Sequence, residues 1–217
     1  MAGLETTHHF GNRVTPIGGL PVHVWQMRRP RWKQVHGVAI AEVFKPGQDL
    51  NEVDGVWTRH ADQPIAVVTA DCVPILLERK DGTAVAALHA GWRGTGSKIV
   101  ESFFHALPPA LADPGHWSAR IGPSIRACCY QVSSELIDQF GATFPSIPRN
   151  VIEPAPRMLD LVAVNQFELS RLGAGLIFVH PDCTFCAADG GNPIYFSYRR
   201  GDRNSRQYSM ISLSSKK

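Results

Sequence analysis

The sequence lacks an apolar run long enough for a transmembrane helix, and no charged start leads into an apolar stretch with a cleavage site. We therefore expect neither a membrane partner nor a signal peptide. Lys and Arg number 22 against 19 acidic residues, and they form no basic stripe of the kind that binds nucleic acid. The five cysteines are an odd number, which argues against a disulfide framework. These absences predict a cytoplasmic protein with reduced thiols and no nucleic-acid partner.

No internal repeat and no low-complexity linker divides the chain, and 217 residues are enough to bury one core. We predict a single domain over residues 1–217. Residues 1–31 carry the weakest pattern, with a glycine turn expected at Gly18-Gly19.

Short apolar runs rich in β-branched residues predict strands, and longer amphipathic runs with caps predict helices. The expected strands are 64–69, 73–78, 83–88, 118–122, 176–179, 194–198 and 207–213. The expected helices are 97–107, one capped by Ser133 and running to Phe140, and 159–172, which ends at Gly173. Strands outnumber helices, and hairpins mix with strand–helix units. This pattern favours an α+β fold.

Asp81-Gly82 lies between two apolar runs and predicts a tight hairpin turn. With these two residues in the turn, Pro74 pairs with His89. The register then brings Cys72 and His89 to the same open end of the hairpin. Local structure alone therefore predicts that a thiol and an imidazole lie close together.

This pair has several interpretations. Thiolate and imidazole are both zinc ligands, and His36 would complete a trio that leaves one coordination position open, as in catalytic sites. No local feature places His36 beside the hairpin. The same pair also suits Cys–His nucleophilic catalysis on a carbonyl or amide. Taken singly, each side chain is equally consistent with an ordinary core residue.

Arginines near glycines and aromatics are candidates for anion binding. The segment Gly91–Gly96 joins a strand to a helix and carries Arg93, whose planar fork suits a phosphate. Arg199-Arg200 follows the aromatic run Tyr195–Tyr198 and suits a flat, anionic substrate. Adjacent strand residues point to opposite faces, so only one of the pair is expected in a pocket, and Arg199 is favoured. The alternative is that all three form surface ion pairs.

The remaining cysteines give a weaker signal. Cys183 and Cys186 form a CxxC, which is half of a zinc knuckle, but the chain has no second CxxC. Cys128-Cys129 is a vicinal pair with the wrong spacing for one. We expect these four cysteines to be buried or partly buried thiols.

Several separate motifs, in order along residues 33–213, resemble the bacterial laccase-domain family, also described as the YfiH-type purine nucleoside phosphorylase family. The matching motifs are 33–37 (KQVHG), 69–74 (TADCVP), 89–94 (HAGWRG), 121–125 (IGPSI), 128–132 (CCYQV), 159–161 (LDL), 182–184 (DCT) and 196–200 (FSYRR). The N-terminal segment 1–31 and residues 201–206 depart from the family pattern.

The resemblance implies a metal on His36, Cys72 and His89, usually zinc, with copper in older descriptions of the family. It implies a layered α/β/β/α fold of mixed sheets, related to cysteine-hydrolase-like toxins. It further implies phosphorolysis of adenosine, inosine and methylthioadenosine, with adenosine deamination at the same site. Hydrolytic editing of peptidoglycan precursors by a Cys–His pair and copper polyphenol oxidation are the alternatives.

With this resemblance, we expect Cys72, His89 and Arg93 to take part in catalysis. Gln34, Arg93, Arg199 and Arg200 are expected to bind a purine nucleoside and phosphate. We expect a monomer or a small homo-oligomer.

Overall fold

The computed structural model describes residues 4–15, 17 and 21–215, so the turn expected at Gly18-Gly19 lies outside the described residues. The strands are β1 (Leu4–Phe10), β2 (Arg31–Lys33), β3 (Ile40–Glu42), β4 (Asp49–Glu52), β5 (Gly55–Thr58), β6 (Ile65–Thr69), β7 (Val73–Arg79), β8 (Val85–Ala90), β9 (Trp117–Ile121), β10 (Ile177–Val179), β11 (Ala188–Asp189), β12 (Asn192–Pro193) and β13 (Gln207–Ser215). The helices are α1 (Val22–Arg28), α2 (Trp92–Gly96), α3 (Ile99–Ala106), the 3-10 turn η1 (Pro114–His116), α4 (Ser134–Thr143), α5 (Arg149–Ile152) and α6 (Leu161–Leu172).

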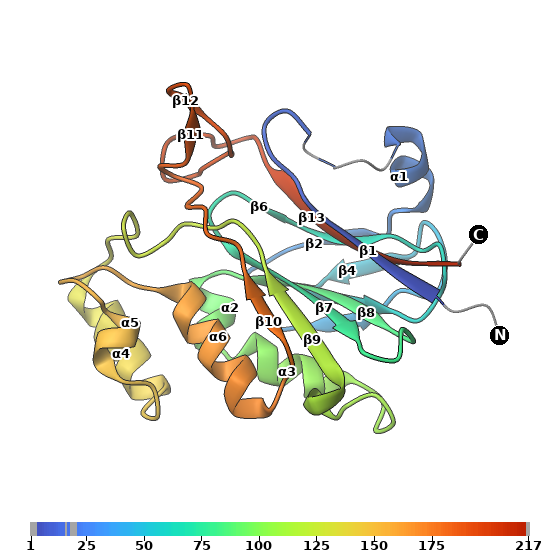
Figure 1. Cartoon of the computed structure of the whole chain (residues 1–217), viewed down its shortest axis with the longest axis horizontal. Coiled ribbons are helices and arrows are strands. Elements are labelled where there is room, and N and C mark those ends of the chain that lie inside the picture. The colour runs from blue at the N-terminus through green and yellow to red at the C-terminus, as the bar shows by residue number, and fades with distance from the viewer. Residues whose placement is uncertain (1–3, 16, 18–20, 216–217) are drawn as a thin grey trace.

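Two sheets make up the centre of the molecule (Figure 1). The larger has six strands in the order β10-β9-β7-β8-β5-β3, and the smaller has three in the order β1-β13-β6. Side chains alternate across β7, so that Leu76 packs between the two sheets with Ile65 and Ile211. Ile75 and Leu77 point the other way, into the core beneath the helices. The larger sheet is therefore covered on both faces.

Helices cover the outer faces of these sheets. Phe103 of α3 and Leu169 of α6 pack against the six-stranded sheet. On the opposite side, Trp25 of α1 packs with Ala66 of β6 and Met210 of β13. The layers thus follow the order α/β/β/α, and the predicted α+β class is confirmed.

The hairpin of β7 and β8 has the register predicted from Asp81-Gly82. Pro74 lies opposite His89, and Val73 lies opposite Ala90. Gly82 adopts a φ of 70°, which glycine reaches without steric cost. Because this turn sets the register, Cys72 and His89 do reach one end of the hairpin.

Two predicted elements differ in the structure. The expected helix 97–107 is preceded by the separate short helix α2, and Lys98, at a φ of 61°, separates α2 from α3. The expected strand 194–198 is wrong, because side chains bind the backbone at its centre, where a strand would pair with a neighbouring strand. Asp202 accepts the Ser197 N–H, and the Gln207 amide binds both the N–H and the carbonyl of Phe196.

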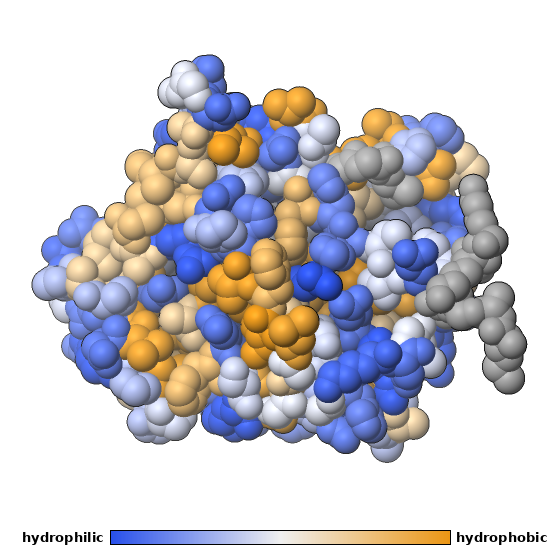
Figure 2. Space-filling view, in the orientation of Figure 1, coloured by the Kyte–Doolittle hydropathy of each residue, from blue (hydrophilic) through white to orange (hydrophobic). Residues whose placement is uncertain are grey.

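The surface carries an apolar area at one edge of the larger sheet. Figure 2 shows hydrophobic residues gathered over β10, where Leu176 and Phe178 are exposed. Within the described ranges, no helix combines the length and the apolar character needed to cross a membrane.

Candidate metal centre

His36, Cys72 and His89 converge from three parts of the chain. His36 follows β2, Cys72 lies in the turn between β6 and β7, and His89 is on β8. One donor atom from each lies within 4.8 Å of the other two. The two imidazole rings meet edge to face, with centroids 4.8 Å apart. His89 is buried, whereas Cys72 is half-buried and His36 is exposed, so the trio opens to solvent on one side.

Asp54, a residue that the sequence analysis missed, brings His36 to the hairpin. Its carboxylate accepts the backbone N–H groups of Val35, His36 and Gly37 at 3.1, 2.9 and 2.7 Å. These bonds stabilise the left-handed conformation of His36, whose φ is 62°. The same carboxylate lies 2.8 Å from Nδ1 of His89. One buried acid therefore orients two of the three candidate ligands.

The charges of the site favour a thiolate. Burial opposes ionisation of Cys72, but the charges and hydrogen bonds of His89 and His36 outweigh it and lower the pKa of the thiol to about 6. Burial also disfavours the His89 imidazolium, yet Cys72 and Asp54 raise its pKa to about 9. Burial likewise opposes ionisation of Asp54, but its bonds to His89 and Gly37 hold its pKa below the usual range.

The donor set fits a zinc ion. One thiolate and two imidazoles are common zinc ligands, and bonds of about 2.3 Å to sulfur and 2.0 Å to nitrogen hold such donors about 3.5 Å apart. Because Asp54 engages Nδ1 of His89, Nε2 remains for the metal, as in carboxylate–histidine–metal arrangements. Gly91 leaves the required room, since a Cβ there would lie 3.0 Å from Cys72 Sγ and 3.1 Å from His36 Cδ2.

Asp71, directly before Cys72, joins the trio to distant segments. It adopts a φ of 92°, and its carbonyl accepts the Ile125 N–H at 2.9 Å. Its carboxylate accepts the Thr184 hydroxyl and the Arg199 backbone N–H, each at 2.7 Å. Hydrogen bonds to Asp71 therefore hold the loops after β9 and β10, and the turn at Arg199, beside Cys72.

A cavity of about 600 Å³ opens above the trio. Its wall includes the aromatic side chains of Trp92, Tyr130 and Tyr198 and three arginines. The arginines are Arg93, Arg199 and Arg206. Within the described parts of the chain, none of the three forms an ion pair with a carboxylate. The cavity thus combines flat apolar surfaces with uncompensated positive charge.

Two other residues expected to contact substrate, Gln34 and Arg200, form hydrogen bonds within the protein. Gln34 lines the cavity, but its amide forms two 2.8 Å hydrogen bonds with the backbone of Val68. Arg200 is not among the residues that line the cavity. Its guanidinium donates to the carbonyls of Phe185 and Tyr195 and to Asp202, and so holds together the loops behind the cavity.

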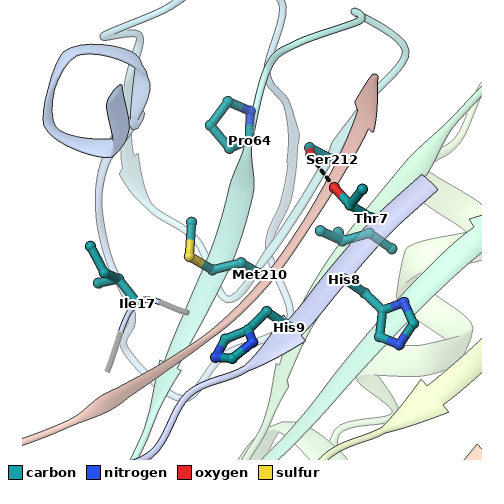
Figure 3. Close-up of a pocket in the computed structure, with 8 residues that line it drawn as sticks. Thr7, His8, His9, Ile17, Pro64, Met210 and Ser212 are labelled. Atoms are coloured by element: carbon teal, nitrogen blue, oxygen red, sulfur yellow. Dashed lines mark hydrogen bonds between the residues drawn. The ribbon is translucent and has the colours of Figure 1, made fainter. Parts of the chain in front are cut away.

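A second cavity, of about 410 Å³, lies on the outer face of the three-stranded sheet (Figure 3). His9, Met210 and Pro64 line it, and a 2.9 Å hydrogen bond joins Thr7 to Ser212. These residues come from β1, from β13 and from the position directly before β6, whereas the trio lies in other segments. This cavity holds none of the predicted site residues.

The four remaining cysteines were expected to be buried or partly buried thiols, and this prediction is confirmed for Cys183 and Cys129 but wrong for Cys128 and Cys186. Cys183 is buried and Cys129 half-buried, but Cys128 and Cys186 are exposed. Their sulfur atoms all lie within 4.8 Å of one another. The loops after β9 and β10, which are far apart in the sequence, bring them together.

The layered fold and its His–Cys trio define an α+β protein with a candidate metal centre at the base of a cavity. The family described as multi-copper polyphenol oxidoreductase laccase matches residues 22–214, and the chain belongs to this family.

Several bacterial proteins are similar to this chain. A Streptomyces coelicolor protein named purine nucleoside phosphorylase is 35% identical over 175 residues, which cover 80% of this chain and 70% of that protein. The purine nucleoside phosphorylase YlmD of Geobacillus stearothermophilus is 33% identical, with 92% of this chain and 85% of that protein covered. A Neisseria meningitidis crystal structure, at 25% identity, superposes with a TM-score of 0.78 over 99% of this chain and 96% of that chain.

Proposed function

We propose that this chain is a metal-dependent purine nucleoside phosphorylase acting on adenosine, inosine and methylthioadenosine, with adenosine deamination as a side activity. In this proposal residues 1–217 form one catalytic domain, which works in the cytoplasm as a monomer or small homo-oligomer. One observation carries the proposal: the His36–Cys72–His89 trio lies in a cavity lined by aromatic rings and by arginines that form no ion pair with the described carboxylates.

The cavity offers separate contacts for the two substrates. A purine is flat and apolar on its faces, so it suits the rings of Tyr130, Tyr198 and Trp92. Burial raises the pKa of Tyr130 to about 12, which keeps its hydroxyl protonated and able to donate a hydrogen bond. Phosphate suits the guanidinium groups of Arg93 and Arg199, which bind oxyanions bidentately and stay charged at any working pH.

In phosphorolysis, an oxygen of phosphate forms a bond to C1′ of the ribose as the bond from C1′ to N9 breaks. The purine leaves with the electron pair of the broken bond and gains a proton. Arg93 and Arg199 would hold the phosphate against C1′, which replaces a bimolecular encounter by a fixed approach. The aromatic wall would hold the purine and exclude water, which competes with phosphate for C1′.

Deamination uses the same cavity with water in place of phosphate. A bound zinc ion supplies Lewis acidity and lowers the pKa of a nearby water. Asp54 keeps His89 in one orientation, and Gly91 leaves space in front of Cys72. Both features belong to the chain itself and keep the donor set open toward the purine.

The test is incubation with adenosine, with and without phosphate and with and without a chelator. We expect adenine and ribose 1-phosphate only when phosphate is present, and a slower formation of inosine that does not need phosphate. Chelation should abolish both activities, and added zinc should restore them. Cys72→Ala is the negative control. Release of adenine that is independent of phosphate would contradict phosphorolysis.

A second candidate is a Cys72–His89 hydrolase acting on an amide, such as one in a peptidoglycan precursor. The low pKa of Cys72, about 6, favours this activity, because the thiolate is the attacking form. A hydrolase of this kind needs neither phosphate nor metal. Amide cleavage that survives the chelator would therefore support it.

The family description also suggests a copper polyphenol oxidase as a third candidate. A centre with two histidines and one cysteine suits a single electron-transfer copper. Copper in the purified protein together with oxygen uptake on a phenol would favour this candidate, and zinc without oxygen uptake would exclude it.

A further inference from the structure

The second cysteine cluster, Cys128, Cys129, Cys183 and Cys186, plays no part in the function proposed above. Cys128 and Cys129 lie in the loop between β9 and α4, and Cys183 and Cys186 lie in the loop between β10 and β11. All four are free thiols in the described structure, and their sulfur atoms lie within 4.8 Å of one another. Two loops more than 50 residues apart along the chain thus present four soft donors at one point.

The spacing of the sulfur atoms fits a tetrahedral ion. Zinc–sulfur bonds of about 2.3 Å place the sulfurs of a tetrahedral tetrathiolate about 3.8 Å apart. The Sγ atoms of Cys128 and Cys186 are 3.8 Å apart. A disulfide would need about 2.05 Å, so this separation is typical of ligands that share an ion and not of a covalent pair.

The loops that carry the cysteines are held together by bonds that do not involve any ion. The Thr184 N–H donates to the Ser124 carbonyl at 3.0 Å, and the guanidinium of Arg126 donates to the His180 carbonyl at 3.1 Å. The Arg126 N–H donates to Sγ of Cys183 at 3.4 Å, a contact that favours the thiolate. The donor set is therefore largely preorganised.

We propose that Cys128, Cys129, Cys183 and Cys186 bind one Zn²⁺ as a closed tetrathiolate site. Four thiols lose four protons as the ion binds, and no electron is transferred. With four protein ligands, no position remains open for water or substrate, so the site is structural. It is separate from the trio, which has three ligands and opens into the cavity.

The site would stabilise one wall of that cavity. The loop with Cys128 and Cys129 continues directly into Tyr130, which lines the cavity. The loop with Cys183 and Cys186 includes Thr184, whose hydroxyl binds Asp71 beside Cys72. An ion that joins the two loops would therefore limit the motion of Tyr130 and of the turn that carries Cys72.

A redox pair is the competing explanation, because the exposed Cys128 and Cys186 face each other. In that case the two thiols would lose two electrons to an oxidant and form a disulfide. The two explanations differ in thiol count, since zinc leaves every thiol titratable after denaturation with a chelator, whereas a disulfide removes two.

The experiment measures bound zinc in the Cys72→Ala protein, in which the trio is broken and the cluster is intact. We expect about one zinc per chain after dialysis without a chelator. In Cys72→Ala/Cys186→Ser, which replaces an exposed cluster cysteine, the bound zinc should fall at least tenfold. The result does not depend on whether the trio binds metal, so it is independent of the proposed function.

Cobalt provides a second readout that does not need a stable zinc complex. Cobalt added to the zinc-free Cys72→Ala protein should give intense thiolate-to-cobalt absorption, which the additional Cys186→Ser change should weaken sharply. Circular dichroism controls for folding of both proteins. The proposal is overturned if Cys72→Ala retains no zinc and gives no such absorption, if the bound metal is iron, or if two of the cluster thiols are missing from the titration under reducing purification.

Discussion

At the scale of single residues, the Asp54 carboxylate links the His36 loop to His89. We expect Asp54→Asn to weaken zinc binding by about 10- to 100-fold, the usual effect of losing a residue that orients a metal ligand. The amide nitrogen of the variant is itself a hydrogen-bond donor, so it cannot accept the backbone N–H groups that bind the carboxylate. Asp49→Asn, at an exposed position, is the matched control. A zinc competition titration compares the two in the Cys186→Ser protein, where the second cysteine cluster is incomplete, and equal affinities would show that Asp54 has no such role.

The glycine at position 91 leaves space beside the trio that any other side chain would occupy. A Cβ at this position would lie 3.0 Å from the Cys72 sulfur, whereas one at Gly96 would meet Phe140 at an ordinary 3.8 Å. In the Cys186→Ser protein, where only the trio should bind zinc, we expect Gly91→Ala to lower zinc content several-fold because Cys72 or His36 must move. Gly96→Ala should leave it unchanged. Metal analysis of both variants, with circular dichroism as a folding control, tests this, and full zinc in Gly91→Ala would refute it.

Arg93 provides the residue-scale test of anion binding. Its guanidinium lies over the Trp92 ring at 4.2 Å and lines the cavity. Arg59 is a matched control, since it is also exposed and lies over a tryptophan, Trp57, but outside the cavity. We expect Arg93→Ala to raise the KM for phosphate at least tenfold, because it removes a charge-assisted contact worth about 1.5 to 3 kcal/mol.

The controls for Arg93 are zinc content and melting temperature, which should barely change. Arg59→Ala should match the parent protein in phosphate use. If Arg93→Ala and Arg199→Ala both turn over the nucleoside normally at low phosphate, these arginines do not bind phosphate and are ordinary surface residues.

The sequence alone was enough to predict that two members of the trio, Cys72 and His89, lie close together. The Asp81-Gly82 turn was enough to pair Cys72 with His89. The position of His36 depended on the family resemblance, because the contact with Asp54 spans 18 residues and follows no periodic pattern. The sequence signal that would have pointed to it is an Asp directly before the short apolar run 55–58, which the structure shows to be a buried strand.

At the scale of elements, the irregular segment 194–206 is held by an ionic contact instead of a strand. Asp202 binds Arg13 at 2.5 Å and Arg200 at 2.8 Å and accepts the Ser197 N–H. Burial opposes its ionisation, but these bonds lower its pKa to about 2. We expect Asp202→Asn to reduce the free energy of unfolding by about 1 to 2 kcal/mol at neutral pH.

The contribution of the Asp202 carboxylate to the free energy of unfolding should depend on pH. Because the pKa of Asp202 is depressed in the folded state, its contribution is complete above the unfolded pKa of about 4. It is lost as the pH falls toward about 2. Urea unfolding from pH 6 downward should show the parent and variant converging, while the exposed Asp189→Asn has no effect. A difference that stays constant with pH would contradict this assignment.

Elements with strong local signals were predicted well, and those stabilised by distant partners were not. Ser133 caps α4 and Gly173 ends α6 with a φ of 92°, as their residue types predict. Residues 194–198 have the composition of a strand, but the backbone N–H groups of Phe196 and Ser197 donate to the side chains of Gln207 and Asp202. Such partners are set by tertiary structure and leave no period in the sequence.

At the scale of the whole molecule, the proposed metal binding would be linked to folding, because the candidate ligands of the trio converge only in the folded chain. His36 follows β2, and the hairpin that places Cys72 and His89 is a central part of the six-stranded sheet. An ion that binds the folded state alone stabilises it by about 2.7 kcal/mol when its free concentration is 100 times the dissociation constant. Each candidate site should therefore contribute its own zinc-dependent stabilisation.

Zinc-dependent unfolding separates the two contributions. In Cys186→Ser, where an exposed cysteine of the second cluster is replaced, added zinc should still raise the melting temperature by several degrees through the trio. In Cys72→Ala/Cys186→Ser the shift should vanish, since both donor sets are then incomplete. A shift that persists in the double variant would mean that zinc stabilises the fold at a place other than the trio and the four cysteines. A shift that is absent from Cys186→Ser but present in Cys72→Ala would place the stabilising ion at the four cysteines and leave the trio without one.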